Sequence, residues 1–429
     1  MRARLADLIA AVLAAGVLTC WAQGYWPVAL VETGGFVVAG IWLAWAAITR
    51  QTVPTGFELL PVAGVVAWGI LQMATGRSVD RFETAKAVLA WAAYAAVFLV
   101  AREVSMRTPE RNRLLRSVLW LGALVSLLTV VQYFSSGGKV FWLFGTDQER
   151  VLGPFLYKNQ CAAFLELVFP LAVYQSLADR RQPLVYVAMA AAMFAAMMAA
   201  VSRAGVLIMV VELITILLLA WCRGLMTAGN LRRTSLWIAA LGLVLAAVVG
   251  SEVTIAKFRE PEPYRVRREL LLSSLAMIAD RPWTGFGLGA WPAVYPAYAR
   301  FDNGLAANHA HNDWAEWAAE GGLPFLALLA MFAVWSIRPA ADSLWGIGVP
   351  AVFVHSLVDY PLREPALAVL LFLLSGALAG RQRNASWNMR KKSIREWDRS
   401  GRACSVPTAI FESACRGRAR PTPFRAHFA

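Results

Sequence analysis

Residues 204–220 read AGVLIMVVELITILLLA, an apolar run interrupted by a single acid, Glu212. A helix of this length spans most of a hydrocarbon core roughly 30 Å thick. Comparable runs recur along the chain, whose 429 residues are 59% hydrophobic and only 16% charged. Such a composition is too apolar for a soluble protein of this size. The sequence therefore predicts an all-α polytopic membrane protein.

Twelve apolar stretches predict membrane-spanning helices within a transmembrane domain of residues 1–380. They lie near residues 5–22, 28–48, 57–73, 85–101, 114–133, 160–178, 184–200, 204–222, 236–250, 322–337, 343–358 and 364–380. The N-terminal MRAR and the apolar run after it also suit a signal peptide, but no clear small-residue cleavage site follows. We expect the first span to be retained.

Positive charge is distributed unevenly between alternate loops. Arginines such as Arg50, Arg181 and Arg338 fall in loops on one side of the predicted bundle. This bias is the positive-inside pattern, and it predicts both termini in the cytoplasm and a large periplasmic loop, residues 251–321, between the ninth and tenth spans. The net charge of +14 is thus a signal of topology, and we expect no nucleic-acid partner.

The C-terminal segment 381–429 differs from the rest of the chain. It is basic, contains RKKSIREWDRSGR at 390–402 and lacks helical periodicity. We expect a disordered cytoplasmic tail attracted to the anionic lipids of the inner leaflet. The five cysteines have no metal-like spacing, so neither a disulfide framework nor a cysteine metal site is predicted.

The periplasmic loop ends in NHAHNDWAEWAAEGG, residues 308–322, which holds two of the four histidines of the chain. Asp313 and Glu316 have the spacing of a capping box, so a helix should begin at Asp313. His311 would then lie beside the positive end of the helix dipole, which favours the neutral, proton-accepting imidazole and a nearby anion. The alternative is a His-Asn pair that only satisfies hydrogen bonds of the turn.

Two other patterns in this loop have simpler interpretations. ELLLSSLAMIAD, residues 269–280, is amphipathic at helical spacing and predicts a helix along the membrane surface. RPWTGFGLGAW, residues 281–291, has three alternating glycines but no preceding strand, so a tight turn is expected and a dinucleotide site is not. Beyond His309 and His311 the chain has only His355 and His427, too few suitable ligands to predict zinc.

Arginines near the external face are the second informative feature. Arg203 separates two apolar runs, where a charged side chain is costly and marks a functional candidate, unless it merely extends to the interface. Several external guanidinium groups near one histidine suggest a site for an anion such as a phosphate. The other cations of the external loops are Arg150, Lys158, Arg265, Arg267 and Arg268.

These residues carry a resemblance to a known family. The pair His311-Asn312, followed after nine residues by Gly322-Leu-Pro-Phe325, resembles the signature of the O-antigen ligase/polymerase superfamily. The supporting segments are ERVLGPFLYKNQCAAFLELVFPLA (149–172), VSRAGVLIMVVEL (201–213) and RRELLLSSLAMIADRPWTGFGLGAW (267–291). Together they cover about residues 145–335. The resemblance implies a GT-C-like bundle of about twelve helices.

The resemblance also implies an activity: inverting glycan transfer at the periplasmic face of the inner membrane, without metal or other cofactor. The donor would be a saccharide on undecaprenyl pyrophosphate, and the acceptor the lipid A-core or another glycan. Arg203 and Arg267 would clamp the pyrophosphate leaving group, and His311 would accept the proton of the attacking hydroxyl. The residues expected to contact phosphate or glycan are Arg265, Arg268, Asn312, Arg150, Lys158 and Asn159.

Two alternatives remain open at this stage. A polymerase of the same superfamily would use the same donor chemistry but extend another repeat unit. A small-anion transporter of the bicarbonate type would instead place its polar groups near the middle of the membrane. The polar residues of this chain gather near one face, which disfavours transport.

Overall fold

The computed structural model describes residues 1–51, 55–148, 150–179, 181–227, 229, 232, 236, 265–300 and 306–400, with the backbone alone from 386 onward. Within these residues the chain is helical almost throughout, and its one small sheet pairs β1 (Lys139–Val140) with β2 (Phe144–Gly145) in antiparallel fashion. Two units are distinguished, Met1–Arg381 and Gln382–Ala429. The prediction of an all-α polytopic membrane protein is confirmed.

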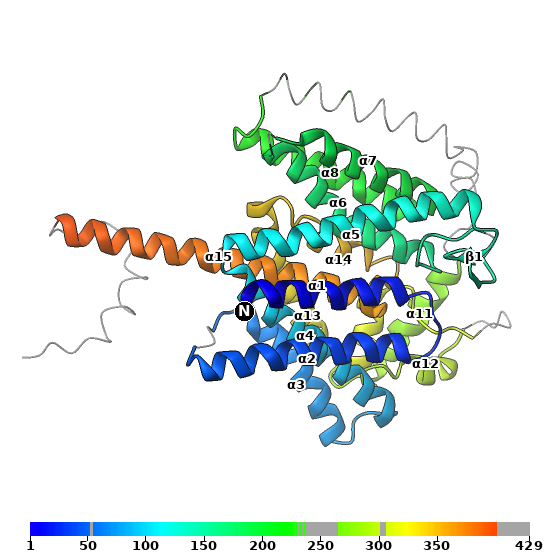
Figure 1. Cartoon of the computed structure of the whole chain (residues 1–429). Helices are drawn as coiled ribbons and strands as arrows, with labels where there is room; N and C mark the ends of the chain where they lie inside the picture. Colours follow the sequence, from blue (N-terminus) through cyan, green and yellow to red (C-terminus); the bar gives the residue numbers. More distant parts are fainter. Residues whose placement is uncertain are drawn as a thin grey trace, which may run out of the picture. The chain divides into compact units, whose positions relative to one another are not determined.

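Figure 1 shows the order of the helices along the chain. Those up to Cys222 are α1 (Arg2–Thr19), α2 (Trp26–Ile48), α3 (Leu59–Ala74), α4 (Arg81–Ser105), α5 (Thr108–Ser135), α6 (Lys158–Ala178), α7 (Pro183–Ala200) and α8 (Arg203–Cys222). Those that follow are α11 (Arg265–Asp280), α12 (Trp291–Val294), the 3-10 turn η1 (Tyr295–Ala297), α13 (Asp313–Ser343), α14 (Gly348–His355), the 3-10 turn η2 (Pro361–Arg363) and α15 (Pro365–Ser400).

Eight of the described helices are long and apolar enough to cross a membrane: α2, α4, α5, α6, α7, α8, α13 and α15 up to Ala385. The other four expected spans differ. The first corresponds to α1, which has charged residues at its start, and the third to α3, with only 16 residues. The ninth, 236–250, lies outside the described residues apart from position 236.

The expected eleventh span, 343–358, is not one long helix. It is replaced by α14, whose eight residues extend only about 12 Å. The helix ends at His355 because backbone carbonyl groups of the residues that follow are bonded to a distant part of the chain. The N–H of Asp313, at the start of α13, points to the carbonyl oxygens of Ser356 (3.0 Å) and Asp359 (3.1 Å). This contact holds the segment after α14 against the expected histidine helix.

Helix α15 begins in the buried centre of the first unit, and its packing there depends on small residues. A Cβ atom on Gly376 would lie 2.4 Å from the carbonyl oxygen of Phe98, and one on Gly380 would lie 2.3 Å from that of Arg102. Both carbonyls belong to α4, so glycine at these positions lets the two backbones approach closely, as is common between membrane helices.

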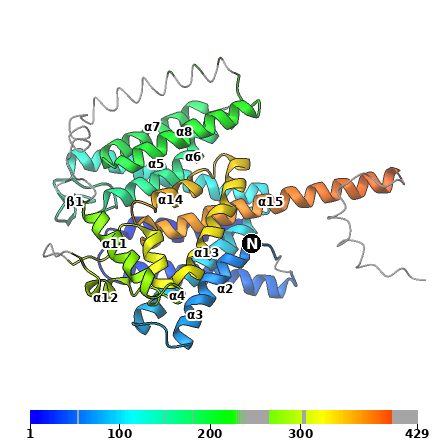
Figure 2. The same cartoon turned by 180° about the vertical axis from the view of Figure 1, so that it is seen from behind.

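Elements outside the predicted spans gather at one end of this unit. Figures 1 and 2 show the β1–β2 hairpin, α11 and α12 together at that end, with Met1 at the other. Helix α11 forms where the amphipathic pattern predicted it, and the glycine-rich segment is the expected turn. A Cβ on Gly285, whose φ is +61°, would lie 2.2 Å from the carbonyl oxygen of Glu320.

The basic C-terminal segment was expected to lack regular structure. Instead α15 continues as helix to Ser400, so residues 381–400 differ from that prediction. Residues 401–429 lie outside the described part of the chain.

Candidate functional site

His311 lies immediately before α13 in a strained turn. Its φ of +51° is in the left-handed region, which non-glycine residues seldom adopt. Helix α13 begins at Asp313 as expected, but its N-cap is Asn312. The Asn312 amide oxygen accepts from Ala315 N (3.0 Å), and its Nδ2 donates to the Leu357 carbonyl oxygen (2.8 Å). Asn312 therefore shapes the turn that presents His311.

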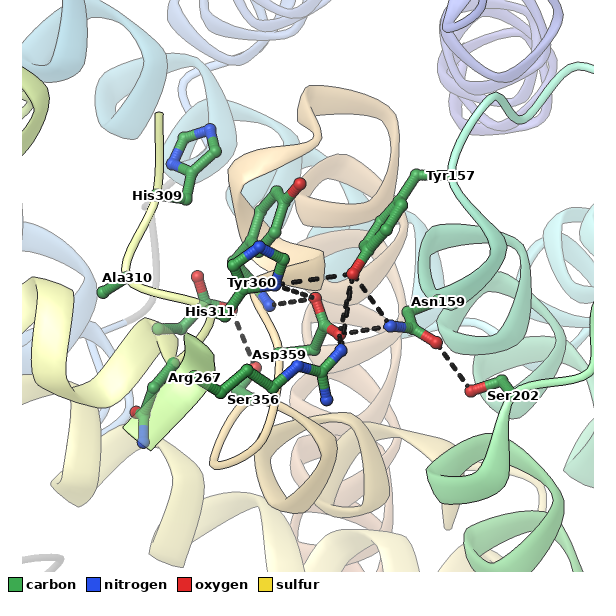
Figure 3. Close-up of polar contacts among 12 residues, drawn as sticks. Tyr157, Asn159, Ser202, Arg267, His309, Ala310, His311, Ser356, Asp359 and Tyr360 are labelled. Atoms are coloured by element: carbon green, nitrogen blue, oxygen red, sulfur yellow. Dashed lines mark hydrogen bonds and ion pairs between the residues drawn. The ribbon is translucent and has the colours of Figure 1, made fainter. Parts of the chain in front are cut away.

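The Tyr157 hydroxyl joins His311 to an arginine and a buried acid (Figure 3). It lies 3.4 Å from His311 Nδ1, accepts from Arg267 Nη2 at 3.4 Å and donates to Asp359 Oδ2 at 3.2 Å. Arg267 Nη2 also donates to Asp359 Oδ2 at 2.7 Å. Asn159 Nδ2 donates to Tyr157 (3.0 Å) and to Asp359. We refer to these five residues as the Tyr157 cluster.

Several helix starts converge on the Tyr157 cluster. Tyr157 is the N-cap of α6 and Asn159 lies in its first turn, while Arg267 lies in the first turn of α11. Ser202, the N-cap of α8, donates from its hydroxyl to Asn159 Oδ1 at 2.8 Å, so the starts of α6 and α8 are tied together. Arg203 is the first residue of α8, and its side chain is half-buried.

The electrostatics of the cluster favour one charged acid and one neutral phenol. Burial alone would raise the pKa of Asp359, but the nearby His311 ring and the Arg267 guanidinium outweigh it and hold this pKa below its ordinary value. Burial and the charge of Asp359 raise the pKa of Tyr157 to about 12. At neutral pH the cluster therefore contains a carboxylate paired with a guanidinium and a protonated tyrosine.

Aromatic rings form a wall beside the cluster, built around Tyr360. The Tyr360 ring stacks with those of Tyr157 (centroids 5.4 Å apart, 17° between planes) and His309 (4.4 Å, 28°). His311 meets Tyr360 edge-on at 4.8 Å. Figure 3 shows His309, Tyr360 and Tyr157 in sequence, with His311 beside them. Both histidines of the loop thus contact one tyrosine.

A second polar cluster contacts this wall through His309. Arg363 of η2 approaches three acids of α13: Asp313 (3.7 Å), Glu316 (3.2 Å) and Glu320 (2.9 Å). Their spacing places them on one face of the helix. Burial would lower the pKa of Arg363, but these carboxyl groups outweigh it and raise that pKa. His309 Nδ1 lies 3.0 Å from Glu316 Oε1, so the cluster reaches the aromatic wall.

The remaining sequence candidates fall into two groups. Arg265 and Arg268 are exposed on α11, and Arg268 pairs with Glu269 at 3.4 Å, so neither belongs to the Tyr157 cluster. Arg150 donates to the Tyr133 hydroxyl and lies over its ring at 4.9 Å. Arg150 and Lys158 line a cavity of about 560 Å³ whose wall includes Tyr157.

Asp359, Tyr360 and Arg363 were missed in the sequence. They belong to DYPLRE, residues 359–364, a polar run with a proline between two apolar stretches. That run was a usable signal, because charged residues at the end of a predicted span suggest that the helix stops there.

Comparison with known proteins supports the resemblance found in the sequence. Residues 188–330 match the family model described as O-antigen ligase. The matched part contains Arg203, Arg267 and His311, whereas Tyr157 and Asp359 lie outside it. No curated protein matches the chain. Over residues 188–330 this membrane protein is therefore similar to O-antigen ligases.

Proposed function

We propose that this O-antigen ligase-like protein transfers a glycan from undecaprenyl pyrophosphate to an acceptor hydroxyl at the periplasmic face of the bacterial inner membrane. The acceptor is the lipid A-core or another glycan, and C1 of the transferred sugar inverts its configuration. The observation that carries this proposal is the shared contact of His311 and Arg267 with the Tyr157 hydroxyl, each at 3.4 Å. A proton acceptor and a cation thus belong to one site.

His311 is the general base of the proposed reaction. Its Nδ1 faces the Tyr157 hydroxyl and lies 3.8 Å from Asp359 Oδ1, while the side chain is 28% exposed. The opposite nitrogen, Nε2, is then the atom that accepts the proton of the acceptor hydroxyl. General-base assistance of this kind contributes about 10²–10⁴-fold to a rate.

Arg267 and Arg203 stabilise the departing pyrophosphate. Arg267 uses Nη2 for its hydrogen bonds to both Tyr157 and Asp359, and the side chain is 26% exposed, so its other N–H groups can face a phosphate. Arg203 heads α8, where the helix dipole adds positive potential. Charge that grows on the leaving group as the C1–O bond breaks is stabilised by such cations.

The 560 Å³ cavity is the proposed place of the saccharide. It adjoins the Tyr157 cluster and presents Gln148, Arg150 and Lys158 beside the rings of Tyr133 and Tyr157. Amide and charged groups bind sugar hydroxyls, and aromatic rings cover the apolar faces of sugars. Asn159 lies in the cluster itself, where its amide positions Asp359 and Tyr157.

The direct test is a purified transfer assay with an undecaprenyl-pyrophosphate-linked oligosaccharide and lipid A-core. Attachment of the oligosaccharide, with or without a chelator, supports metal-independent ligation. Longer oligosaccharides without attachment indicate the polymerase alternative, and absence of any transfer contradicts both. Transport is disfavoured because the Tyr157 cluster is built from the starts of α6 and α11 and the turn before α13, away from the helix centres.

A further inference from the structure

His309 is a second histidine of the aromatic wall, and a buried carboxylate holds it. Its Nδ1 lies 3.0 Å from Oε1 of Glu316, a residue whose side chain is 1% exposed. The other oxygen, Glu316 Oε2, accepts from the Ala310 N–H at 2.8 Å. The His309 side chain is 30% exposed. A histidine held by a carboxylate at Nδ1 and accessible from outside is suited to exchange a proton at Nε2.

His309 contacts a cluster of buried acids through Glu316. Glu316 belongs to the second polar cluster, where three carboxyl groups surround the single guanidinium of Arg363. His309 is the partly exposed histidine that contacts this cluster. A proton on its ring would form a charge-assisted hydrogen bond with Glu316.

The surroundings of His311 differ in this respect. Its acidic neighbour Asp359 already has a cationic partner, since Arg267 Nη2 lies 2.7 Å away. Its other polar contact among the described residues is the neutral Tyr157 hydroxyl. The two histidines touch the same Tyr360 ring, but an excess of acid surrounds one and a balanced pair the other. Different charged surroundings of two neighbouring titratable groups are the usual basis for assigning one as the acid and the other as the base.

We propose that His309, oriented by Glu316, donates a proton to the leaving pyrophosphate; this inference rests on the proposed glycan transfer. The acceptor oxygen forms its bond to C1 as the bond between C1 and the phosphate oxygen breaks, and the electron pair stays on that oxygen. His311 takes the hydroxyl proton, while His309 Nε2 gives its proton to the pyrophosphate. Solvent then returns both rings to their starting forms.

Binding of undecaprenyl pyrophosphate to the purified protein, measured at about pH 6 and pH 8, tests the charge on His309 without turnover. The wild type should bind more tightly at pH 6, and His309→Gln should lose about tenfold in affinity at that pH and most of the pH dependence. Asn308→Gln, an exposed neighbour on the same segment, is the matched control. The lipid phosphate ionises in the same way in assays of this variant. Its affinity for undecaprenyl pyrophosphate and the pH dependence of that affinity should therefore match those of the wild type.

His309→Arg separates positive charge from proton donation. It should bind the probe at both pH values yet transfer glycan about 10²-fold more slowly, because arginine keeps its proton. Wild-type turnover in His309→Arg would overturn proton donation. Unchanged binding and pH dependence in His309→Gln would overturn the whole inference while leaving the proposed function intact. A wild type that binds no undecaprenyl pyrophosphate would instead contradict the proposed donor.

Discussion

Arg267 Nη2 donates a 2.7 Å hydrogen bond to Oδ2 of Asp359. The bond joins the start of α11 to the segment between α14 and α15. Asp359 is 1% exposed, whereas Arg267 is 26% exposed, so the acid anchors a guanidinium whose other edge is accessible. A buried carboxylate of this kind fixes an arginine in place before substrate arrives, which makes its electrostatic contribution larger.

Asp359→Asn should lower the transfer rate by about 10–100-fold, because a charge-assisted bond worth roughly 1.5–3 kcal/mol is lost and Arg267 is released. Initial rates of the purified variant at saturating acceptor measure this effect. Asp280→Asn is the matched control, since Asp280 is an exposed acid at the end of the same α11. Equal losses in both variants would contradict a specific role for Asp359.

His311→Ala should reduce transfer by about 10²–10⁴-fold, because no other group in the Tyr157 cluster is placed to take the acceptor proton. In cells the lipid-linked donor should accumulate while the protein remains in the membrane. Quantifying both by gel and immunoblot separates loss of chemistry from loss of the protein. Normal glycan display by this variant would remove the base assignment.

Arg203→Lys should be nearly as damaging as Arg203→Ala if the arginine holds a phosphate through two parallel bonds. Lysine preserves the charge but lacks the planar pair of donors. The ratio of kcat/KM for donor in the two variants is the measurement, with Arg77→Lys, an exposed arginine between α3 and α4, as control. Wild-type activity in Arg203→Lys would indicate that the side chain only extends to the interface.

Local patterns predicted much of the fold, because the length of an apolar run is largely sufficient to predict a membrane helix. The start of α13 at Asp313 and the helical α11 were also readable from nearby residues. The end of α14 was not, since it depends on a hydrogen bond from the Asp313 N–H to the Ser356 carbonyl oxygen, across more than forty residues. This contact shortened an expected span.

The same long-range contact explains why the site was only partly predicted. His311, Arg267 and Asn159 could be selected by residue type, but their common partner Asp359 directly follows the expected span 343–358 and was not selected. The cap of α13 was also misassigned, because Asn312 and Asp313 are both good N-cap residues. Only the tertiary contacts of Asp313 with Ser356 and Leu362 distinguish them.

Glu364, which precedes α15, gives a prediction about stability. Burial raises its pKa from 4.5 to about 7, partly offset by the hydrogen bond with the Ala366 backbone. The folded protein therefore binds this proton more tightly than the unfolded chain, and stability should fall as the pH rises from about 4.5 to about 7 and then level off.

Glu364→Gln has no proton to lose, so its melting temperature should decline less than that of the wild type between pH 5 and pH 8. Thermal unfolding of both proteins in one detergent measures the difference, and Glu269→Gln, at a partly exposed acid of α11, controls for the loss of an acid. Parallel declines in Glu364→Gln and the wild type would mean that Glu364 already carries its charge in the folded protein, which would contradict its burial as an acid.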